Sequence, residues 1–163
     1  MSTIRSQTAE RAKHYFDRKG LQLEERLGFG VQGVVYATNR KSAVKAFDRE
    51  EHYCRERDVY FRFMEQGFLD AAGFNVPRLI DFDDELWIVE MGIVKPPFVV
   101  DFAGVYLDRP PPFSEDELAE WEQERIELFG DDWDQVKLVM AAFRRIKVYL
   151  NDVKPGNVTV RDG

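Results

Sequence analysis

The chain has 163 residues, of which 44% are hydrophobic and 13% aromatic, so it can bury a sizeable core and extensive disorder is excluded. Its net charge of −7 argues against nonspecific binding to DNA or RNA, although a local lysine and backbone amides suffice to bind a nucleotide. A single cysteine, Cys54, excludes an intrachain disulfide framework and fits a reducing compartment. With no signal-peptide pattern and no apolar run of membrane-spanning length, we expect a cytoplasmic protein without membrane contact; the oligomeric state stays open.

The first half of the chain is predicted to be rich in strands arranged around one long helix. Apolar residues at helical spacing (Ala9, Ala12, Tyr15 and Phe16) predict a first helix that ends before Gly20. Asp48 is a candidate cap for the long helix, with Glu51 as its capping-box partner. The expected elements are a helix over 8–19, β-structure over 21–36, a strand over 42–47, a helix over 48–66, and strands over 76–82 and 85–91.

The second half is predicted to be mainly helical. Prolines at 96–97 and 110–112 bracket a segment that we expect to be irregular, because proline disrupts both helices and central strands. Ser114 caps an acidic helix through about Phe129, and a further helix is predicted over 132–150. A short strand is expected over 158–160. This order predicts the α+β class rather than an alternating parallel α/β sheet.

Three glycines, Gly28, Gly30 and Gly33, form a Gly-x-Gly-x-x-Gly pattern between two stretches of β character. Glycine lets backbone amides approach a polyphosphate closely. A dinucleotide-binding fold has the same spacing, but there a helix follows the glycines. Here strands follow, so the pattern favours a glycine-rich hairpin that covers phosphates; an ordinary glycine-rich turn is the alternative.

Lys45 ends an apolar strand, and the helix that follows carries a possible partner. Tyr53, Glu56, Tyr60 and Phe63 share one helix face, and a carboxylate within an aromatic stripe needs a partner because an unpaired buried charge is costly. We therefore expect a Lys45–Glu56 ion pair. Glu50 and Glu51 are alternatives, but capping or the helix dipole explains carboxylates at a helix start. Taken alone, Lys45 is better interpreted as an exposed strand-end lysine; the helix that follows is what favours the ion pair.

The sequence Asp152-Val153-Lys154-Pro155-Gly156-Asn157 follows the last predicted helix. Together with the glycines and Lys45, it resembles the protein kinase family, of the serine/threonine type, over roughly 21–160. The resemblance implies a two-lobed fold with an antiparallel-sheet N-lobe over 21–91 and a minimal, mostly helical C-lobe over 92–163, preceded by a helical extension over 1–20. A plain helix-to-strand loop is the alternative interpretation of this segment.

The resemblance also implies that the chain binds ATP and Mg²⁺. Asp152 would orient and deprotonate an acceptor hydroxyl, Lys154 would contact the transferred phosphate, and Asn157 would bind magnesium. Lys45, held by Glu56, would position phosphates. Residues expected around the nucleotide are Leu27, Gly28, Gly30, Gly33, Val35, Ala43, Lys45, Val89, Glu90 and Met91, with Glu90 and Met91 contributing backbone groups to the adenine edge.

The sequence departs from the family in two places. Leu150-Asn151 stands where a His-Arg pair usually precedes the aspartate. In the family, a β-hairpin leads from the asparagine to an Asp-Phe-Gly segment whose aspartate holds magnesium. Here 161–163 is predicted to be a turn, and Asp162 is too close to Asn157 to be that aspartate. We therefore expect only the first part of a kinase, without the metal aspartate, activation segment and substrate-binding helices.

Three functions remain open from the sequence. The first is an ATP-dependent phosphotransferase that acts on a serine or threonine hydroxyl, with a protein substrate or a regulatory protein as partner. Kinases of small molecules share the Asp-to-Asn loop, but Lys154 favours a protein kinase. The second is a non-catalytic pseudokinase that binds a nucleotide or a partner protein. The third is an unrelated α+β binding domain.

Overall fold

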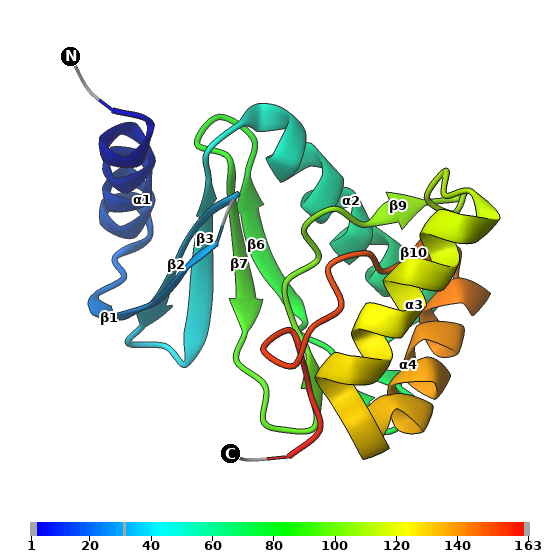
Figure 1. Cartoon of the computed structure of the whole chain (residues 1–163). Helices are drawn as coiled ribbons and strands as arrows, with labels where there is room; N and C mark the ends of the chain where they lie inside the picture. The colour runs from blue at the N-terminus through cyan, green and yellow to red at the C-terminus, as the bar shows by residue number, and fades with distance from the viewer. Residues whose placement is uncertain (1–2, 31, 162–163) are drawn as a thin grey trace. The chain divides into compact units, whose positions relative to one another are not determined.

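The computed structural model describes residues 3–30 and 32–161 (Figure 1). The chain divides into two compact units. The first comprises Met1–Phe61 and Pro77–Ile93, and the second Arg62–Val76 and Val94–Gly163. The expected α+β class is confirmed, with an antiparallel sheet in the N-terminal part and a mostly helical C-terminal part.

The first unit is built on an antiparallel five-stranded sheet in the order β1-β2-β3-β7-β6. The expected strands and both expected helices are present, with end points that differ from the predictions by a few residues. The elements are α1 Ile4–Lys19, β1 Leu23–Gly30, β2 Gly33–Thr38, β3 Ser42–Phe47, α2 Glu50–Gln66, β6 Leu79–Asp83 and β7 Ile88–Gly92.

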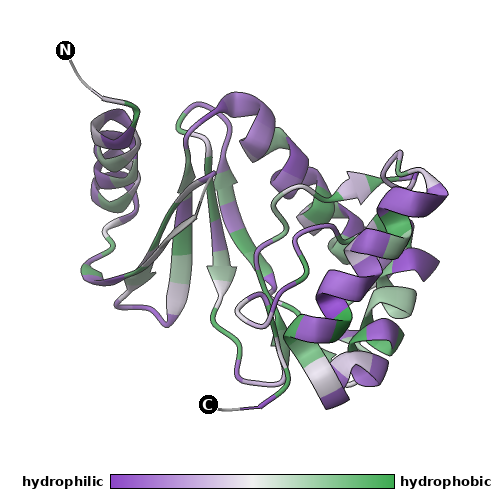
Figure 2. Cartoon of the chain, in the orientation of Figure 1, coloured by the Kyte–Doolittle hydropathy of each residue, from purple (hydrophilic) through white to green (hydrophobic). Residues whose placement is uncertain are grey.

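Helix α1 begins earlier than predicted because Thr3 caps it. The Thr3 hydroxyl accepts a hydrogen bond from the backbone N–H of Ser6 at 3.1 Å, and the helix stops at Gly20, whose φ of 65° suits glycine. Its buried face includes Thr8 rather than the predicted Ala9, which is exposed. Figure 2 shows hydrophilic and hydrophobic residues alternating along the helix, as expected for an element with one buried side.

The strand register fixes two faces of the sheet, because successive side chains point to opposite sides. On one face, α1 packs its apolar residues against Val44, Ala46 and Ile88. The other face carries Lys45 and the residues that lie opposite it on the neighbouring strands, and α2 packs against this face. On this second face the ring of Phe47 makes an edge-to-face contact with the ring of Tyr53 in α2, with the ring centroids 5.8 Å apart.

The second unit combines helices with short strands, of which the sequence predicted only the last, over 158–160. The elements are β4 Asp70–Ala71, β5 Phe74–Asn75, β8 Phe98–Val99, β9 Tyr106–Leu107, α3 Glu115–Phe129, the 3₁₀ turn η1 Gly130–Asp132, α4 Trp133–Arg145, β10 Val148–Tyr149 and β11 Val158–Thr159. The strands form a four-stranded sheet, β11-β8-β5-β4, and a separate β10-β9 pair.

Two predictions in the second unit were wrong. The last helix ends at Arg145 rather than at Leu150, because Lys147 adopts a φ of 60° that an α-helix does not accommodate. The segment between the proline pairs, expected to be irregular, contains β8 and β9. The acidic helix α3 was predicted correctly, including its cap, in which Ser114 accepts from the N–H of Glu117 at 3.1 Å.

An aromatic cluster forms the core of the second unit. Phe63, at the end of α2, contacts Phe68, Phe102 and Phe143 with ring centroids between 5.1 and 5.9 Å apart. Phe102 and Phe143 are fully buried. None of the helices in the described part of the chain is long and apolar enough to cross a membrane.

Candidate functional site

The expected ion pair between Lys45 and Glu56 is present in the first unit. Lys45 Nζ donates to Glu56 Oε1 at 2.5 Å, and the two residues are only 4% and 1% exposed. The alternatives Glu50 and Glu51 are exposed at the helix start. Opposite charges so deeply buried must be paired, since desolvation would otherwise exceed any gain. A strand and a helix therefore fix the lysine ammonium in one position.

Most of the apolar residues expected around a nucleotide share a sheet face with Lys45. Val35 and Val89 lie directly opposite Lys45 on the two neighbouring strands, and Ala43 lies opposite Met91. Residues directly opposite each other in a ladder project to the same side. The hydroxyl of Tyr60 in α2 donates to Met91 Sδ at 3.1 Å, which places Met91 on this face. Leu27 in β1 is 48% exposed.

The glycines of the predicted phosphate loop differ in their surroundings. A Cβ added to Gly33 would lie 2.4 Å from the carbonyl oxygen of Ala46, so close strand packing requires this glycine. A Cβ on Gly28 would meet nothing within 4 Å. Gly28 is therefore the position at which open space permits a ligand to approach the backbone. The surroundings of Gly30 and all of residue 31 lie outside what the structure describes.

Glu90 points away from the Lys45 face. Its carboxylate accepts hydrogen bonds from the hydroxyls of Tyr15 at 2.7 Å and Ser42 at 2.6 Å, on the α1 side of the sheet. Burial and the bond to Glu90 raise the pKa of Tyr15 above its ordinary value. The Glu90 side chain thus ties α1 to the sheet. Sequence analysis missed this role, because nothing local marks Tyr15 as its partner.

The Asp152–Asn157 segment lies in the second unit and forms a hydrogen-bonded loop. Asn157 Nδ2 donates to the backbone oxygen of Asp152 at 2.8 Å and to its Oδ2 at 3.1 Å. Lys154 Nζ lies 3.5 Å from the same Oδ2, and Asn157 is 7% exposed. The side chains of Asp152 and Lys154 are 43% and 53% exposed. A buried amide therefore holds a carboxylate and a lysine that both reach solvent.

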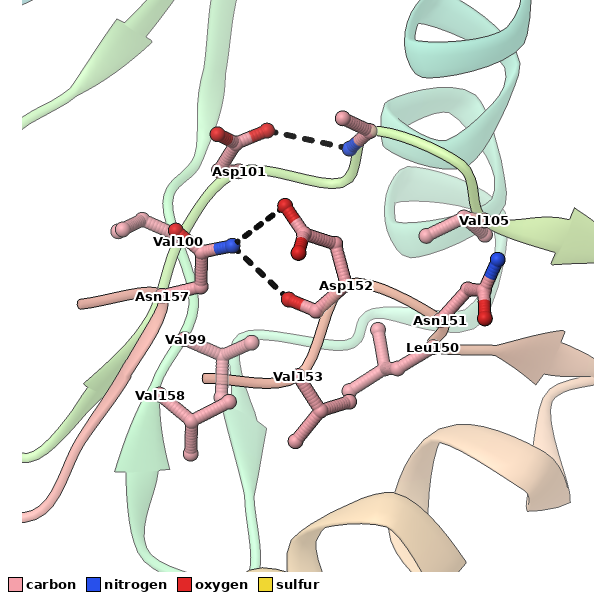
Figure 3. A pocket seen from close by; sticks show the side chains of 11 residues that line it. Val99, Val100, Asp101, Val105, Leu150, Asn151, Asp152, Val153, Asn157 and Val158 are labelled. Carbon is pink, nitrogen blue, oxygen red and sulfur yellow. Dashed lines mark hydrogen bonds between the residues drawn. The ribbon is translucent and has the colours of Figure 1, made fainter. Parts of the chain in front are cut away.

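This loop lines a pocket together with the segment that leads from β8 toward β9 (Figure 3). The lining residues are Val99, Val100, Asp101, Ala103, Val105, Leu150, Asn151, Asp152, Val153, Asn157 and Val158. The pocket lining thus combines two carboxylates and two side-chain amides with residues that are otherwise apolar. Sequence analysis did not single out Asp101, although an Asp-Phe pair directly after the apolar Val99-Val100 was a usable signal.

Few side chains in the described residues are grouped so that they could bind a metal ion. Among residues 3–30 and 32–161, no three or more His, Cys, Asp or Glu side chains are grouped as a metal site. Magnesium bound with a nucleotide takes only one or two protein carboxylates and completes its shell with phosphate oxygens and water. Asn157 and the pocket carboxylates fit that kind of site. The predicted turn over 161–163 falls largely outside the described residues.

Comparisons with known proteins give similarity only to solved structures. No known family profile matches the sequence, and no curated protein matches it. A structure of aminoglycoside phosphotransferase APH(2'')-Ib with bound ADP is 19% identical with a TM-score of 0.41, over 75% of this chain and 40% of that one. A streptomycin–ATP complex of APH(2'')-IIa is 14% identical with a TM-score of 0.43, over 83% and 40%. The chain spans about two fifths of both.

Proposed function

We propose that this chain is a kinase-like phosphotransferase that binds ATP and transfers its γ-phosphate to a hydroxyl group. The observation that supports it most is the buried Lys45–Glu56 pair, with Val35, Ala43 and Val89 on the same sheet face. A lysine fixed in this way supplies a positive charge to phosphates, and the apolar neighbours offer a surface for an adenine ring. The open backbone at Gly28 adds room for the phosphates.

In the proposed transfer step, three residues of the 152–157 loop each have one role. Asp152 accepts the proton of the acceptor hydroxyl as its oxygen forms a bond to the γ-phosphorus. The bond between that phosphorus and the β–γ bridging oxygen breaks, and ADP leaves with the electron pair. Lys154, which is half exposed, balances charge on the transferred group. Mg²⁺, when bound, would neutralise phosphate charge, with Asn157 among its ligands.

For the acceptor, we propose a serine or threonine hydroxyl of a protein. The support is Lys154, which lies two residues after Asp152 and 3.5 Å from its carboxylate, close enough for the two groups to act on one reacting group. Small-molecule hydroxyls are the competing acceptor class, because an Asp-to-Asn loop serves both. A phosphotransfer assay must therefore offer both classes of acceptor.

A non-catalytic nucleotide-binding module is the second candidate. The observation that favours it is that the Asp152 carboxylate is already engaged within its own loop, by Asn157 Nδ2 at 3.1 Å and by Lys154 Nζ at 3.5 Å. On this account the Lys45 face binds ATP, but no phosphate is transferred.

Incubation of the chain with radiolabelled [γ-³²P]ATP and Mg²⁺ tests the proposal. Two acceptor pools are used, serine- and threonine-containing peptides and a panel of aminoglycosides. We expect label on the peptides that disappears in Asp152→Asn, while Asp116→Asn, a change in the exposed first turn of α3, retains it. Label on the aminoglycosides alone would overturn the proposed acceptor. No label in either pool, with ATP still bound, would favour the non-catalytic module.

A further inference from the structure

The loop that carries Asn157 is flanked by two strands, and both pair with one earlier segment of the chain. Strand β11, which follows the loop, pairs antiparallel with β8, with Val158 opposite Val99. Strand β10, which precedes the loop, pairs antiparallel with β9, with Tyr149 opposite Tyr106. Residues 98–107 are therefore held along both sides of the loop, although they precede it by some fifty positions in the sequence.

This pairing brings Asp101 to the loop. The backbone N–H of Val100 donates to the carbonyl of Asn157 at 2.8 Å, so Asp101 is the next residue after a direct contact with the candidate metal ligand. Asp101, Asp152 and Asn157 line the same pocket, as Figure 3 shows. The Asp101 carboxylate accepts from the N–H of Ala103 at 3.1 Å. A carboxylate has about four acceptor sites, so this bond is compatible with binding a cation.

The residue after Asp101 anchors the turn in the core. Phe102 is fully buried and contacts Phe63 and Phe143, with ring centroids 5.1 and 6.0 Å away. Asp101 itself has a φ of 65°, a conformation that aspartate and asparagine adopt more readily than most residues. Strand pairing on both sides and the buried ring together fix where the carboxylate stands.

We propose that Asp101 is the metal aspartate of this site, and that it binds Mg²⁺ opposite Asn157 from a segment that precedes the loop in the chain. This inference rests on the proposed function and changes one expectation drawn from the sequence. The resemblance to kinases places the metal aspartate after the asparagine, at the end of a β-hairpin. Here the strand antiparallel to β11 is β8, and Asp101-Phe102 follows it.

The chemistry of the donor set agrees with this assignment. Mg²⁺ prefers oxygen ligands and, next to a nucleotide, needs few from the protein. One carboxylate and one amide oxygen, with Asp152 nearby, match that requirement. Asn157 can bind the cation through its side-chain oxygen while its Nδ2 continues to donate to Asp152, as it does here.

Paramagnetic broadening by Mn²⁺ tests the assignment without any need for activity. In a ¹H–¹⁵N spectrum of the whole chain, Mn²⁺ added without nucleotide should selectively broaden the amides of 100–104 and 152–158. Asp101→Asn should weaken the Mn²⁺ affinity at least about tenfold, as expected for loss of a direct ligand. Asp116→Asn, on the exposed start of α3, should leave the broadening unchanged. Asparagine retains the side-chain oxygen and tolerates the backbone conformation, and the spectrum itself reports whether the variant is folded.

The outcomes separate this inference from the proposed function. Unbroadened amides around the pocket in the unchanged chain, or equal broadening in Asp101→Asn, would overturn the metal assignment, whether or not ATP binds. Local broadening that Asp101→Asn removes would establish it, even if the same preparation failed to bind ATP. That combination would reject the nucleotide site at Lys45 and retain the metal site.

Discussion

The two units hold their candidate functional groups in opposite ways. In the first, Lys45 and Glu56 project from a central strand and a long helix and are almost completely buried. In the second, Asp152 and Lys154 stand on a loop and their side chains are about half exposed, whereas Asn157, the third candidate residue of that loop, is buried. The first arrangement fixes one charge in place. The second leaves a carboxylate and an ammonium group accessible to solvent, as the proposed transfer to an external hydroxyl requires.

Removal of one partner of the buried pair should have the largest effect. Glu56→Ala leaves the Lys45 ammonium buried without its carboxylate, so we expect a loss of about 3–5 kcal/mol in the free energy of unfolding. Urea denaturation measures this. Asp134→Ala, which removes the exposed pair with Lys137, is the control and should cost about 0.5 kcal/mol or less. Equal losses in the two variants would contradict the contrast between buried and exposed charges.

The glycines of the β1–β2 hairpin provide the next test. Gly33→Ala forces a Cβ against the Ala46 carbonyl, so we expect a cost of about 1–3 kcal/mol in stability. Gly28→Ala meets no atom within 4 Å, so its stability should change by less than about 0.5 kcal/mol. Its ATP affinity should nevertheless fall, because the added methyl occupies the space assigned to the phosphates. A large stability loss in Gly28→Ala would show that this position is structural too.

In the second unit, Asn157→Ala should have a smaller effect on stability than the changes at Glu56 and Gly33. It removes the bonds to the backbone oxygen and the carboxylate of Asp152, which we expect to cost about 1–2 kcal/mol. The matched control is Asn75→Ala, which removes a bond from an exposed amide to the carbonyl of Lys95 and should cost about 0.5 kcal/mol or less. If chemical denaturation gives the same value for both, the loop is not held by Asn157.

The smallest effect should appear at alkaline pH, through Tyr15. Because burial and the bond to Glu90 raise its pKa, the folded state keeps a proton that the unfolded chain loses near pH 10. The stability contributed by Tyr15 is therefore complete below about pH 10 and declines as the pH rises further, by up to about 1.4 kcal/mol per pH unit. Tyr15→Phe should make stability fall less steeply above pH 10. An unchanged slope would contradict the role of this hydroxyl.

Sequence reasoning succeeded where a regular helix carries the candidate residues. The period of α2 placed Tyr53, Glu56 and Tyr60 on one face, and all three are buried there. The end of α4 was wrong because its apolar spacing continues to Ile146 and Leu150, while the backbone turns at Lys147. The two-residue strands β8 and β9 are too short for a periodic signal. Their pairing with β11 and β10 is long-range, so the place of Asp101 beside Asn157 could not be read from the order of residues.

The central claim is that Lys45 and its sheet face bind ATP. Thermal unfolding of the chain with and without ATP, each with and without Mg²⁺, tests it most directly. ATP at about 100 times its dissociation constant should stabilise the folded state by roughly 2.7 kcal/mol, which raises the unfolding midpoint measurably. We predict that this rise in the unfolding midpoint is larger with Mg²⁺ than without it. In Lys45→Ala, ATP should leave the midpoint at the value that the variant has without ATP. An unchanged midpoint with ATP under every condition would contradict the claim.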